Sequence, residues 1–376
     1  MKIIFVLRSI ANRGGVERTL IDKANYLATK GHNVLFVTYE QGNHPFAFGL
    51  SSLIVHQDLD CRLFVLYNYS FVRRVLLYIK MALVFRKRWN ALIDKYQPDV
   101  VVVTTYSCDF ICKIMGVRDK TRVVVESHSA YTHDMIPNGF VDRMKKRLFL
   151  RNIKKCDVLI CLTNGDAKCW KECVKNVKTL KNPIVYYPDL MSCYNRKTGR
   201  IISVGRLQSQ KRYDRLISVS ALIAPKYPQW YIDIYGKGNL YNQLKDLIKD
   251  KGLEGRVFLH EPIENIYNEY MQSQFLVLSS DYEGLPLVLL EAMSFGLPVI
   301  STDCPFGPSE IIKHQNNGLL CEMDYKDLSE KMEWMIIHDD ERQAMAIKAR
   351  QTASHYKKEI VMKQWENTYF TQLNPI

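Results

Sequence analysis

Two glutamates, Glu283 and Glu291, stand with seven residues between them around the start of a predicted helix. The preceding run, residues 275–278, is short and apolar, as expected of a buried parallel strand. A helix is predicted over residues 286–295, and Gly296 ends it. Glu283 then lies in the loop before the helix, and Glu291 lies about one turn inside it. Carboxylates in these places can accept hydrogen bonds from the hydroxyl groups of a ligand.

The backbone at the start of this helix adds an anion-binding element. The N–H groups within residues 284–288, to which Pro286 contributes none, have no helical partners, and they lie at the positive end of the helix dipole. Open α/β sheets bind ligands at the carboxyl ends of their strands, where this loop is expected. Amides for a phosphate beside carboxylates for hydroxyl groups suit a sugar nucleotide. The plain alternative is that both glutamates are ordinary solvated acids.

A pair of cationic side chains follows the end of another predicted strand. Arg206 follows the predicted strand at residues 200–204, and Lys211 stands five residues later, before a helix that begins near Asp214. Arginine can hold two phosphate oxygens at once, whereas lysine adds a point charge. One basic residue here would mean little, and the pair places two such groups five residues apart.

Both segments resemble a known family. The stretch YEGLPLVLLEAMSFGLPVISTD, residues 282–303, and the stretch GRLQSQKRYDRLI, residues 205–217, are similar to motifs of the retaining glycosyltransferases of family four. Members of that family have the GT-B fold, in which two doubly wound, Rossmann-like α/β domains face each other across a cleft. The resemblance covers nearly the whole chain.

The resemblance implies a role for each site residue. Arg206 and Lys211 would neutralise the diphosphate leaving group, Glu283 would accept from the transferred sugar, and Glu291 would accept from the ribose. No metal or other cofactor is expected, and the nucleotide sugar, with UDP the expected nucleotide, is a co-substrate. The implied catalytic residues are Glu283, Arg206, Lys211 and His128. The implied donor-binding residues are Gly15, Arg206, Lys211, Gly236, Pro262, Glu283, Gly284, Leu285, Pro286 and Glu291.

Two positions in the first half of the chain belong to this set. A glycine pair, Gly14 and Gly15, precedes a helix, and a plain turn explains it as well as a ligand does. It resembles the family's glycine loop, which faces the donor diphosphate and the acceptor. His128 directly follows a predicted strand, as does the family histidine that contacts the transferred sugar, and His133 is its rival.

Two further positions lie in the second half. The predicted strand at residues 231–235 runs into Gly236-Lys-Gly238, a short glycine motif that is weak evidence for a phosphate loop when taken alone. In the family it lines the nucleotide side of the cleft. Pro262 follows the next strand, where the resemblance implies contact with the base.

The length of 376 residues fits two domains. We predict an acceptor-binding domain over residues 1–185 and a nucleotide-sugar-binding domain over residues 186–355. The last segment, residues 356–376, is expected to form a helix that packs back on the first domain. The first apolar run is interrupted by Arg8, so it favours a buried strand over a signal peptide, and we expect a cytoplasmic protein. Ten cysteines without metal-site spacing indicate reduced thiols.

Positive charge is concentrated in the first half of the chain. Residues 1–190 carry 30 Lys and Arg against 16 Asp and Glu, whereas the remainder carries 22 against 23. Two segments, residues 71–89 and 143–155, combine basic and apolar side chains, with Leu76 among those at helical spacing. Such helices can lie on the anionic inner surface of the cell membrane. A core helix with a solvated basic face is the alternative, and no nucleic-acid-binding module is recognised.

Taken together, these features predict a retaining glycosyltransferase. It would move a hexose or N-acetylhexosamine from a nucleotide diphosphate sugar to a lipid-linked or surface-polysaccharide acceptor. Two alternatives stay open: a nucleotide-sugar epimerase of the same fold, and a non-catalytic module that binds sugar nucleotides. Consumption of the donor without any acceptor would indicate the epimerase, and binding without turnover would indicate the module.

Overall fold

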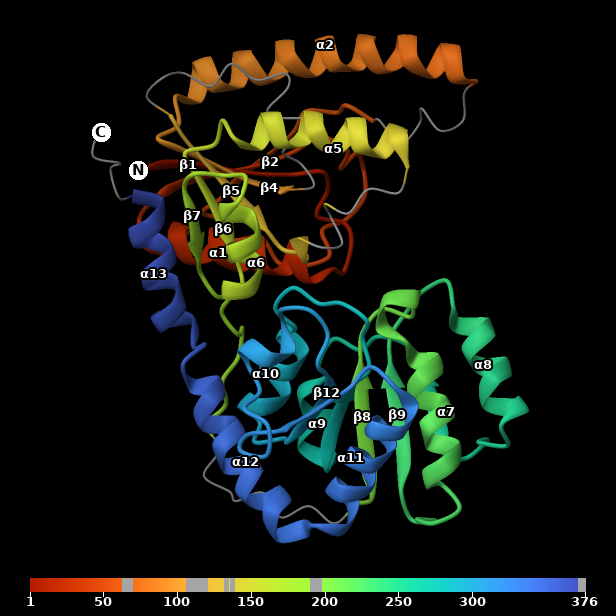
Figure 1. The fold of residues 1–376 in the computed structure, drawn as a ribbon. Coiled ribbons are helices and arrows are strands. Elements are labelled where there is room, and N and C mark those ends of the chain that lie inside the picture. Colours follow the sequence, from red (N-terminus) through yellow and green to blue (C-terminus); the bar gives the residue numbers. More distant parts are fainter. Residues whose placement is uncertain (63–69, 106–120, 132–134, 136–138, 190–197, 371–376) are drawn as a thin grey trace. The chain divides into compact units, whose positions relative to one another are not determined.

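The computed structural model describes residues 1–62, 70–105, 121–131, 135, 139–189 and 198–370 (Figure 1). The strand expected near Leu63–Leu66 and the rival histidine His133 lie outside this part of the chain. The chain divides into two compact units. The first comprises residues 1–162 and 166–180 and the segment from Met362 onward, and the second comprises residues 163–165 and 181–361.

The first unit contains a seven-stranded parallel sheet with the order β3-β2-β1-β4-β5-β6-β7. Short links and β-branched strands favour this doubly wound arrangement. Its elements are β1 (Lys2–Leu7), α1 (Gly15–Thr29), β2 (Asn33–Thr38), β3 (Val55–Asp58), α2 (Phe71–Tyr96), β4 (Val100–Thr104), β5 (Arg122–Ser127), α5 (Phe140–Ile153), β6 (Val158–Cys161), α6 (Asn164–Lys171) and β7 (Val177–Thr179).

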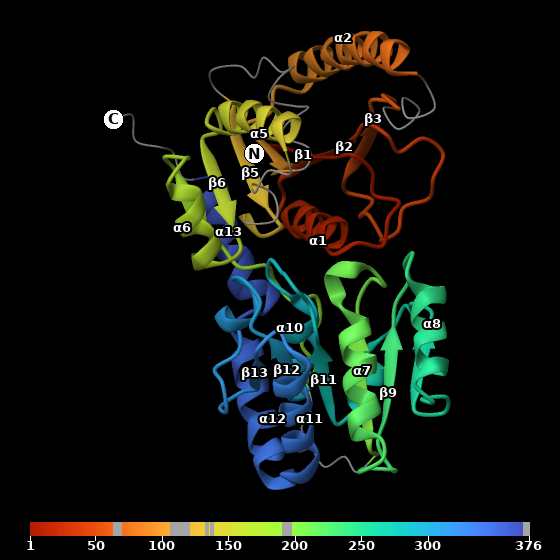
Figure 2. The ribbon, with the colours of Figure 1, turned by 45° about the vertical axis from the view of Figure 1, so that its right-hand side comes forward.

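Successive side chains of β1 point to opposite faces of this sheet. Ile4 and Val6 enter the core cluster that also contains Phe85 and Trp89 from the second half of α2. Phe5 on the other face packs against Phe36 of β2. Helices α2 and α5 accordingly cover one face of the sheet and α1 covers the other, as both views show (Figures 1 and 2).

The second unit contains a six-stranded parallel sheet with the order β10-β9-β8-β11-β12-β13. Its elements are β8 (Arg200–Val204), η2 (Ser209–Lys211), α7 (Tyr213–Ile223), β9 (Tyr231–Tyr235), α8 (Tyr241–Asp250), β10 (Val257–His260), α9 (Tyr267–Gln272), β11 (Phe275–Leu278), α10 (Leu287–Ser294), β12 (Val299–Thr302), η3 (Pro308–Glu310), β13 (Leu319–Cys321), α11 (Tyr325–Ile337), α12 (Asp339–Ser354) and α13 (Lys358–Phe370).

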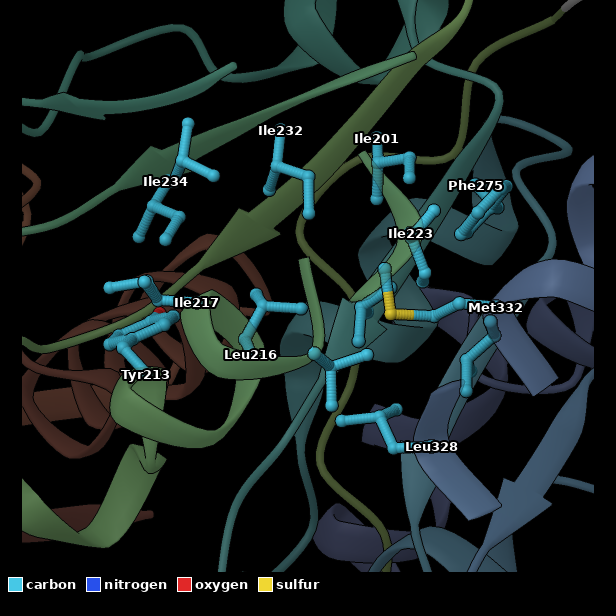
Figure 3. Close-up of a cluster of buried hydrophobic side chains, with 14 of the residues drawn as sticks. Ile201, Tyr213, Leu216, Ile217, Ile223, Ile232, Ile234, Phe275, Leu328 and Met332 are labelled. Carbon is cyan, nitrogen blue, oxygen red and sulfur yellow. The ribbon is translucent and has the colours of Figure 1, made fainter. Parts of the chain in front are cut away.

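The core of the second unit lies between the sheet and its helices. Isoleucines of β8 and β9 meet the apolar side of α7, and Leu328 and Met332 of α11 close the cluster (Figure 3). Both sheets have the strand order of two Rossmann-like domains, so the predicted α/β fold class is confirmed. In each sheet the chain changes direction beside the first strand, which places a topological switch point between β1 and β4 and another between β8 and β11.

The last helix, α13, joins the first unit over its second half. Trp365 and Tyr369 are fully buried there. The ring of Tyr369 meets Phe5 of β1 edge-on, and the Trp365 ring lies under the ammonium of Lys23 from α1, 3.1 Å from its centroid. Residues late in the sequence therefore complete a core that begins with the first strand.

We predict that replacing Trp365 with alanine destabilises the first unit. Deleting a buried tryptophan leaves a cavity, and such changes cost about 3–5 kcal/mol. Urea unfolding followed by circular dichroism would measure this loss. The matched control is Ile360→Ala on the same helix, because Ile360 is 48% exposed and its truncation is expected to change little. Equal unfolding midpoints for the two variants would contradict the assigned burial.

Candidate functional site

The candidate site of the second unit lies at the switch point between β8 and β11. The loop after β8 carries Arg206 and Lys211, and the loop after β11 carries Glu283. These two strands are hydrogen-bonded neighbours in a parallel sheet, so both loops leave the same edge. Two short segments that are far apart in the sequence are thereby brought together.

The decisive contact joins Lys211 to Glu283. Nζ of Lys211 donates to Oε1 of Glu283 at 2.5 Å, and the hydroxyl of Ser280 donates to the same oxygen at 2.6 Å. The two charged side chains are only 13% and 8% exposed. A shielded pair of this kind is much less screened by salt than a surface ion pair. Because an ammonium has three donors, Lys211 can also bind phosphate oxygens while it holds Glu283.

Arg206 is linked to the same place through glutamine and backbone contacts. Its side chain is exposed, and Nη2 donates to Oε1 of Gln210 at 3.3 Å. The amide of Gln210 donates to the carbonyl of Tyr282 at 2.8 Å, and the carbonyl of Gln210 accepts from the N–H of Asp281 at 2.9 Å. The loop that carries both basic residues is therefore fastened to the loop that carries Glu283.

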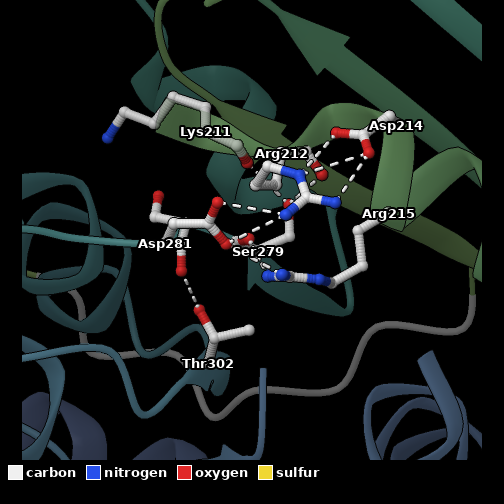
Figure 4. A network of polar contacts seen from close by, with 8 residues as sticks. Lys211, Arg212, Asp214, Arg215, Ser279, Asp281 and Thr302 are labelled. Carbon is white, nitrogen blue, oxygen red and sulfur yellow. Dashed lines mark hydrogen bonds and ion pairs between the residues drawn. The ribbon is translucent and has the colours of Figure 1, made fainter. Parts of the chain in front are cut away.

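A second ionic network also joins the loop after β8 to the loop after β11 (Figure 4). Arg212 bridges Asp214 and Asp281 at 2.9 and 3.0 Å, and Arg215 donates to Asp281 and to the Ser279 carbonyl at 2.8 Å each. The hydroxyl of Ser279 donates to the Lys211 carbonyl at 2.9 Å. In Figure 4 the Lys211 ammonium points away from this network.

Sequence reasoning missed this network, although its members flank the predicted site. Arg212 has a φ of 49°, a left-handed conformation that costs a non-glycine residue roughly 1–3 kcal/mol. Its guanidinium is bound by two aspartates, Asp214 and Asp281. A positive φ on an arginine has no signature in a single sequence, and Asp281 lies too far along the chain for a local pattern.

The start of α10 is closely packed against the following loop. A Cβ on Gly307 would stand 2.1 Å from the Gly284 carbonyl, so only glycine fits there. Leu285 and Pro286 are buried, and Pro286 has no N–H, so it adds no amide donor at the start of α10. Glu291 lies half-buried in the second turn of α10, as expected.

The glycine motif after β9 has a packing reason. A Cβ on Gly236 would stand 1.9 Å from the Gly205 carbonyl, and one on Gly238 would stand 2.2 Å from the Leu207 carbonyl. These glycines let the loop after β9 lie directly against the loop that carries Arg206. Pro262 lies exposed in the loop after β10, at the same edge of the sheet.

The two candidates of the first unit lie at the carboxyl ends of its strands. Gly15 is the first residue of α1, and a Cβ there would meet nothing within 4 Å. The His128 ring follows β5 and is only 3% exposed, and its Nε2 lies 2.9 Å from Oε2 of Glu126. Burial lowers the pKa of His128, although Glu126 opposes the shift, so the ring is neutral at pH 7.

Comparisons with known proteins agree with this geometry. Residues 13–184 match the family described as Glycosyltransferase Family 4, and residues 194–352 match the one described as Glycosyl transferases group 1. The chain belongs to the family 4-type glycosyltransferases of the GT-B fold. Two matches that lie side by side in this order are expected of such an enzyme, because one covers each unit.

Relatives of this glycosyltransferase cover it almost completely. An uncharacterised glycosyltransferase of Haemophilus influenzae is 28% identical over 97% of this chain and 99% of its own length. A Campylobacter jejuni enzyme named as a GalNAc-alpha-(1->4)-GalNAc-alpha-(1->3)-diNAcBac-PP-undecaprenol alpha-1,4-N-acetyl-D-galactosaminyltransferase is 26% identical over 97% of both chains. The structure of an S. aureus TarM variant with fondaparinux, alpha-GlcNAc-glycerol and UDP matches with a TM-score of 0.78 and 16% identity, over 98% of this chain and all of the other.

Among the described residues, no group of three His, Cys, Asp or Glu side chains is arranged to hold a metal ion. An Asp-x-Asp sequence occurs at residues 58–60, and its carboxylates bind neighbouring groups. Asp58 accepts from the Thr38 hydroxyl and the Gly42 N–H, and Asp60 pairs with Arg62. Across the described helices, none is both long and apolar enough to cross a bilayer.

We predict opposite effects for two glycine-to-alanine changes. Gly236→Ala would push a methyl group into the Gly205 carbonyl, and overpacking of this kind costs about 1–3 kcal/mol. Gly15→Ala places the methyl group in open space and is expected to leave stability unchanged or to raise it by up to about 1 kcal/mol. Thermal unfolding of both variants measures the difference. Wild-type stability of Gly236→Ala would show that the close loop packing is not required.

Proposed function

We propose that this glycosyltransferase moves a hexose or N-acetylhexosamine from a nucleotide diphosphate sugar to a lipid-linked or surface-polysaccharide acceptor, with retention of configuration. UDP is the proposed nucleotide. The observation that carries the proposal is the 2.5 Å contact of Lys211 with Glu283 at the switch point of the second sheet. It brings a cation for the diphosphate and a carboxylate for the sugar into one place.

In the proposed reaction, negative charge develops on the diphosphate leaving group. The bond between the anomeric carbon and the diphosphate oxygen breaks, and its electron pair stays on the diphosphate. An acceptor hydroxyl forms the new bond on the same face of the sugar, and its proton passes to the departing oxygen. Arg206, Lys211 and the amides at the start of α10 would stabilise the negative charge without a metal ion.

Three further groups complete the proposed donor site. Glu283 would accept from the sugar hydroxyls, Glu291 from the ribose, and His128 of the first unit would contact the transferred sugar. No covalent nucleophile is assigned. The thiol of Cys304 is influenced by the charge of Glu283, but burial, aided by that charge, raises its pKa to about 12, so it stays protonated at neutral pH.

The relatives support the proposed substrate classes. The name of the Campylobacter jejuni enzyme states an undecaprenol-linked glycan acceptor, and the TarM structure contains UDP beside a sugar ligand. The epimerase and the non-catalytic module are not favoured, because the relatives are named as transferases. Screening nucleotide sugars for protection against thermal unfolding would identify the donor.

The clamp is tested by Lys211→Ala. Removing a charge that stabilises the leaving group is expected to lower turnover about 100- to 1,000-fold. A radiolabelled nucleotide sugar with a lipid-linked acceptor would report turnover, and circular dichroism would verify folding. The matched control is Lys226→Ala, since Lys226 pairs with Glu333 on the surface of α11 and is expected to be dispensable. Wild-type turnover in a folded Lys211→Ala enzyme would remove this residue from the mechanism.

We also propose that the first unit binds an anionic membrane through α2 and α5. Three apolar side chains at helical spacing in the first half of α2 do not enter the core: Leu76, Ile79 and Leu83 are 64%, 52% and 62% exposed. On α5, Met144 and Leu148 are 52% and 46% exposed. Both helices lie on the same face of the first sheet (Figures 1 and 2). Exposed basic residues accompany them: Arg73, Lys80, Arg86, Lys87, Arg88, Arg143, Arg147 and Arg151.

These exposures argue against the reading of the first half of α2 as a core helix with a solvated basic face. Among the described side chains of α2, those in the core cluster, such as Phe85 and Trp89, belong to its second half. Exposed leucines beside basic residues are typical of helices that lie in the membrane interface. Each basic residue near an anionic surface contributes about 1 kcal/mol to binding. We therefore place the enzyme, as a peripheral protein, on the cytoplasmic face of the cell membrane.

Flotation with lipid vesicles tests this placement. The protein is expected to float with phosphatidylglycerol vesicles in low salt, less in high salt because of screening, and not with phosphatidylcholine vesicles. The double variant Leu76→Ser/Leu83→Ser is expected to float several-fold less. Leu53→Ser is the control, because Leu53 is equally exposed at 63% but lies outside both helices. If the wild-type protein stays at the bottom of the low-salt gradient, the membrane proposal is wrong.

A further inference from the structure

Four polar side chains meet in the interior of the first unit. Oε2 of Glu126 accepts from Lys23 at 2.8 Å and lies 2.9 Å from Nε2 of His128. Its other oxygen, Oε1, accepts from the hydroxyl of Tyr369. Lys23 and Glu126 have no exposed side-chain surface, Tyr369 is fully buried, and Trp365 covers the Lys23 ammonium.

A buried ion pair needs a reason other than stability. Removing two charges from water costs several kcal/mol per ion, and replacing such pairs by apolar side chains is often neutral or stabilising. Glu126 lies in β5, and His128 follows the end of the same strand at the carboxyl edge of the sheet. The cluster therefore reaches from the interior of the unit to a residue of the proposed site.

The charges of the cluster determine where the His128 proton lies. Burial would raise the pKa of Glu126, but Lys23 and His128 outweigh it and lower this pKa to about 2. Glu126 is thus ionised and can only accept hydrogen bonds. Because Nε2 of His128 faces this carboxylate, Nε2 must carry the proton, and in the neutral ring Nδ1 is then the unprotonated nitrogen.

We infer that Glu126 is a positioning residue that sets the tautomer and orientation of His128, and that Tyr369 brings the last helix into this arrangement. The inference rests on the proposed contact of His128 with the transferred sugar. A carboxylate that holds a working imidazole in one tautomer is a recurring device in enzymes. Here the carboxylate is itself held from two sides, by Lys23 of α1 and by Tyr369 of α13.

Charged and titratable groups from three described elements act on His128. Glu126 belongs to its own strand, Lys23 comes from α1, and Tyr369 comes from α13 and acts through Glu126. Glu126 raises the pKa of His128, whereas burial and Lys23 lower it. Removing the charge of Glu126 should therefore lower this pKa further. Removing the Tyr369 hydroxyl should raise it, because the carboxylate then bonds more strongly to the ring.

Two variants with opposite expected effects test the inference. Glu126→Gln should move the acidic limb of the pH profile of kcat/KM to lower pH, and Tyr369→Phe should move it to higher pH. Loss of a hydrogen bond to a charged group is expected to lower kcat about tenfold or more in Glu126→Gln, with little change in KM for the nucleotide sugar. Tyr356→Phe is the control, since this buried tyrosine lies outside the cluster and belongs to the second unit.

Nitrogen-15 NMR of histidine-labelled full-length protein gives a readout that does not depend on activity. The His128 signals, assigned by their loss in His128→Asn, should report a neutral ring protonated at Nε2, and Glu126→Gln should change them. A ring protonated at Nδ1, or signals unaffected by Glu126→Gln, would overturn the inference. If Glu126→Gln does not fold, an unchanged pH profile and unchanged signals in Tyr369→Phe would also overturn it.

The same experiments separate the inference from the proposed function. If the His128→Asn variant retains full turnover while the NMR signals follow Glu126 as expected, the positioning of His128 is supported and its proposed contact with the sugar is wrong. If both variants lose stability in thermal unfolding but the pH limb does not move in either direction, the cluster is structural only and the inference is wrong.

Discussion

A lysine must be held next to a largely buried carboxylate without either charge being left unpaired, and the second unit is arranged to meet this constraint. Lys211 reaches Glu283 because β8 and β11 are adjacent, although the 70 residues 205–274 lie between the two strands in the sequence. The Arg212–Asp281 ion pair joins the two loops behind the contact. Glycines at positions 236 and 307 then allow neighbouring loops to approach the same edge closely.

The first unit also holds a lysine next to a carboxylate, in its interior. Lys23 and Glu126 are completely removed from water, and the cluster is satisfied by hydrogen bonds and by the face of Trp365. In the second unit the paired charges lie at a sheet edge, where a ligand can replace or share contacts. In the first unit the paired charges, Lys23 and Glu126, lie in the interior. Glu126 contacts His128, which follows the end of β5 at the sheet edge.

Much of the fold could be predicted from the sequence, because parallel strands are buried on both faces and read as apolar runs. The run at residues 100–104 and the strand–loop–helix around Glu283 are examples. Strand β3 was not predicted, since Val55–Asp58 has polar side chains and alternating exposure. The Lys211–Glu283 contact follows from a recognisable pattern, whereas the Arg212–Asp281 and Lys23–Glu126 pairs do not. Both depend on pairings over long sequence distances, and a lysine on a helix is ordinarily solvated.

The path of the last helix has a consequence for synthesis on the ribosome. Because Trp365 and Tyr369 complete the core that contains Phe5, the first unit cannot reach its final packing when its own strands have been translated. Domains generally fold in the order in which they emerge. Here the unit made first must wait, with an open apolar surface, until residues 362–370 leave the exit tunnel. Chaperones that shield nascent chains should therefore bind the first unit until these residues become available.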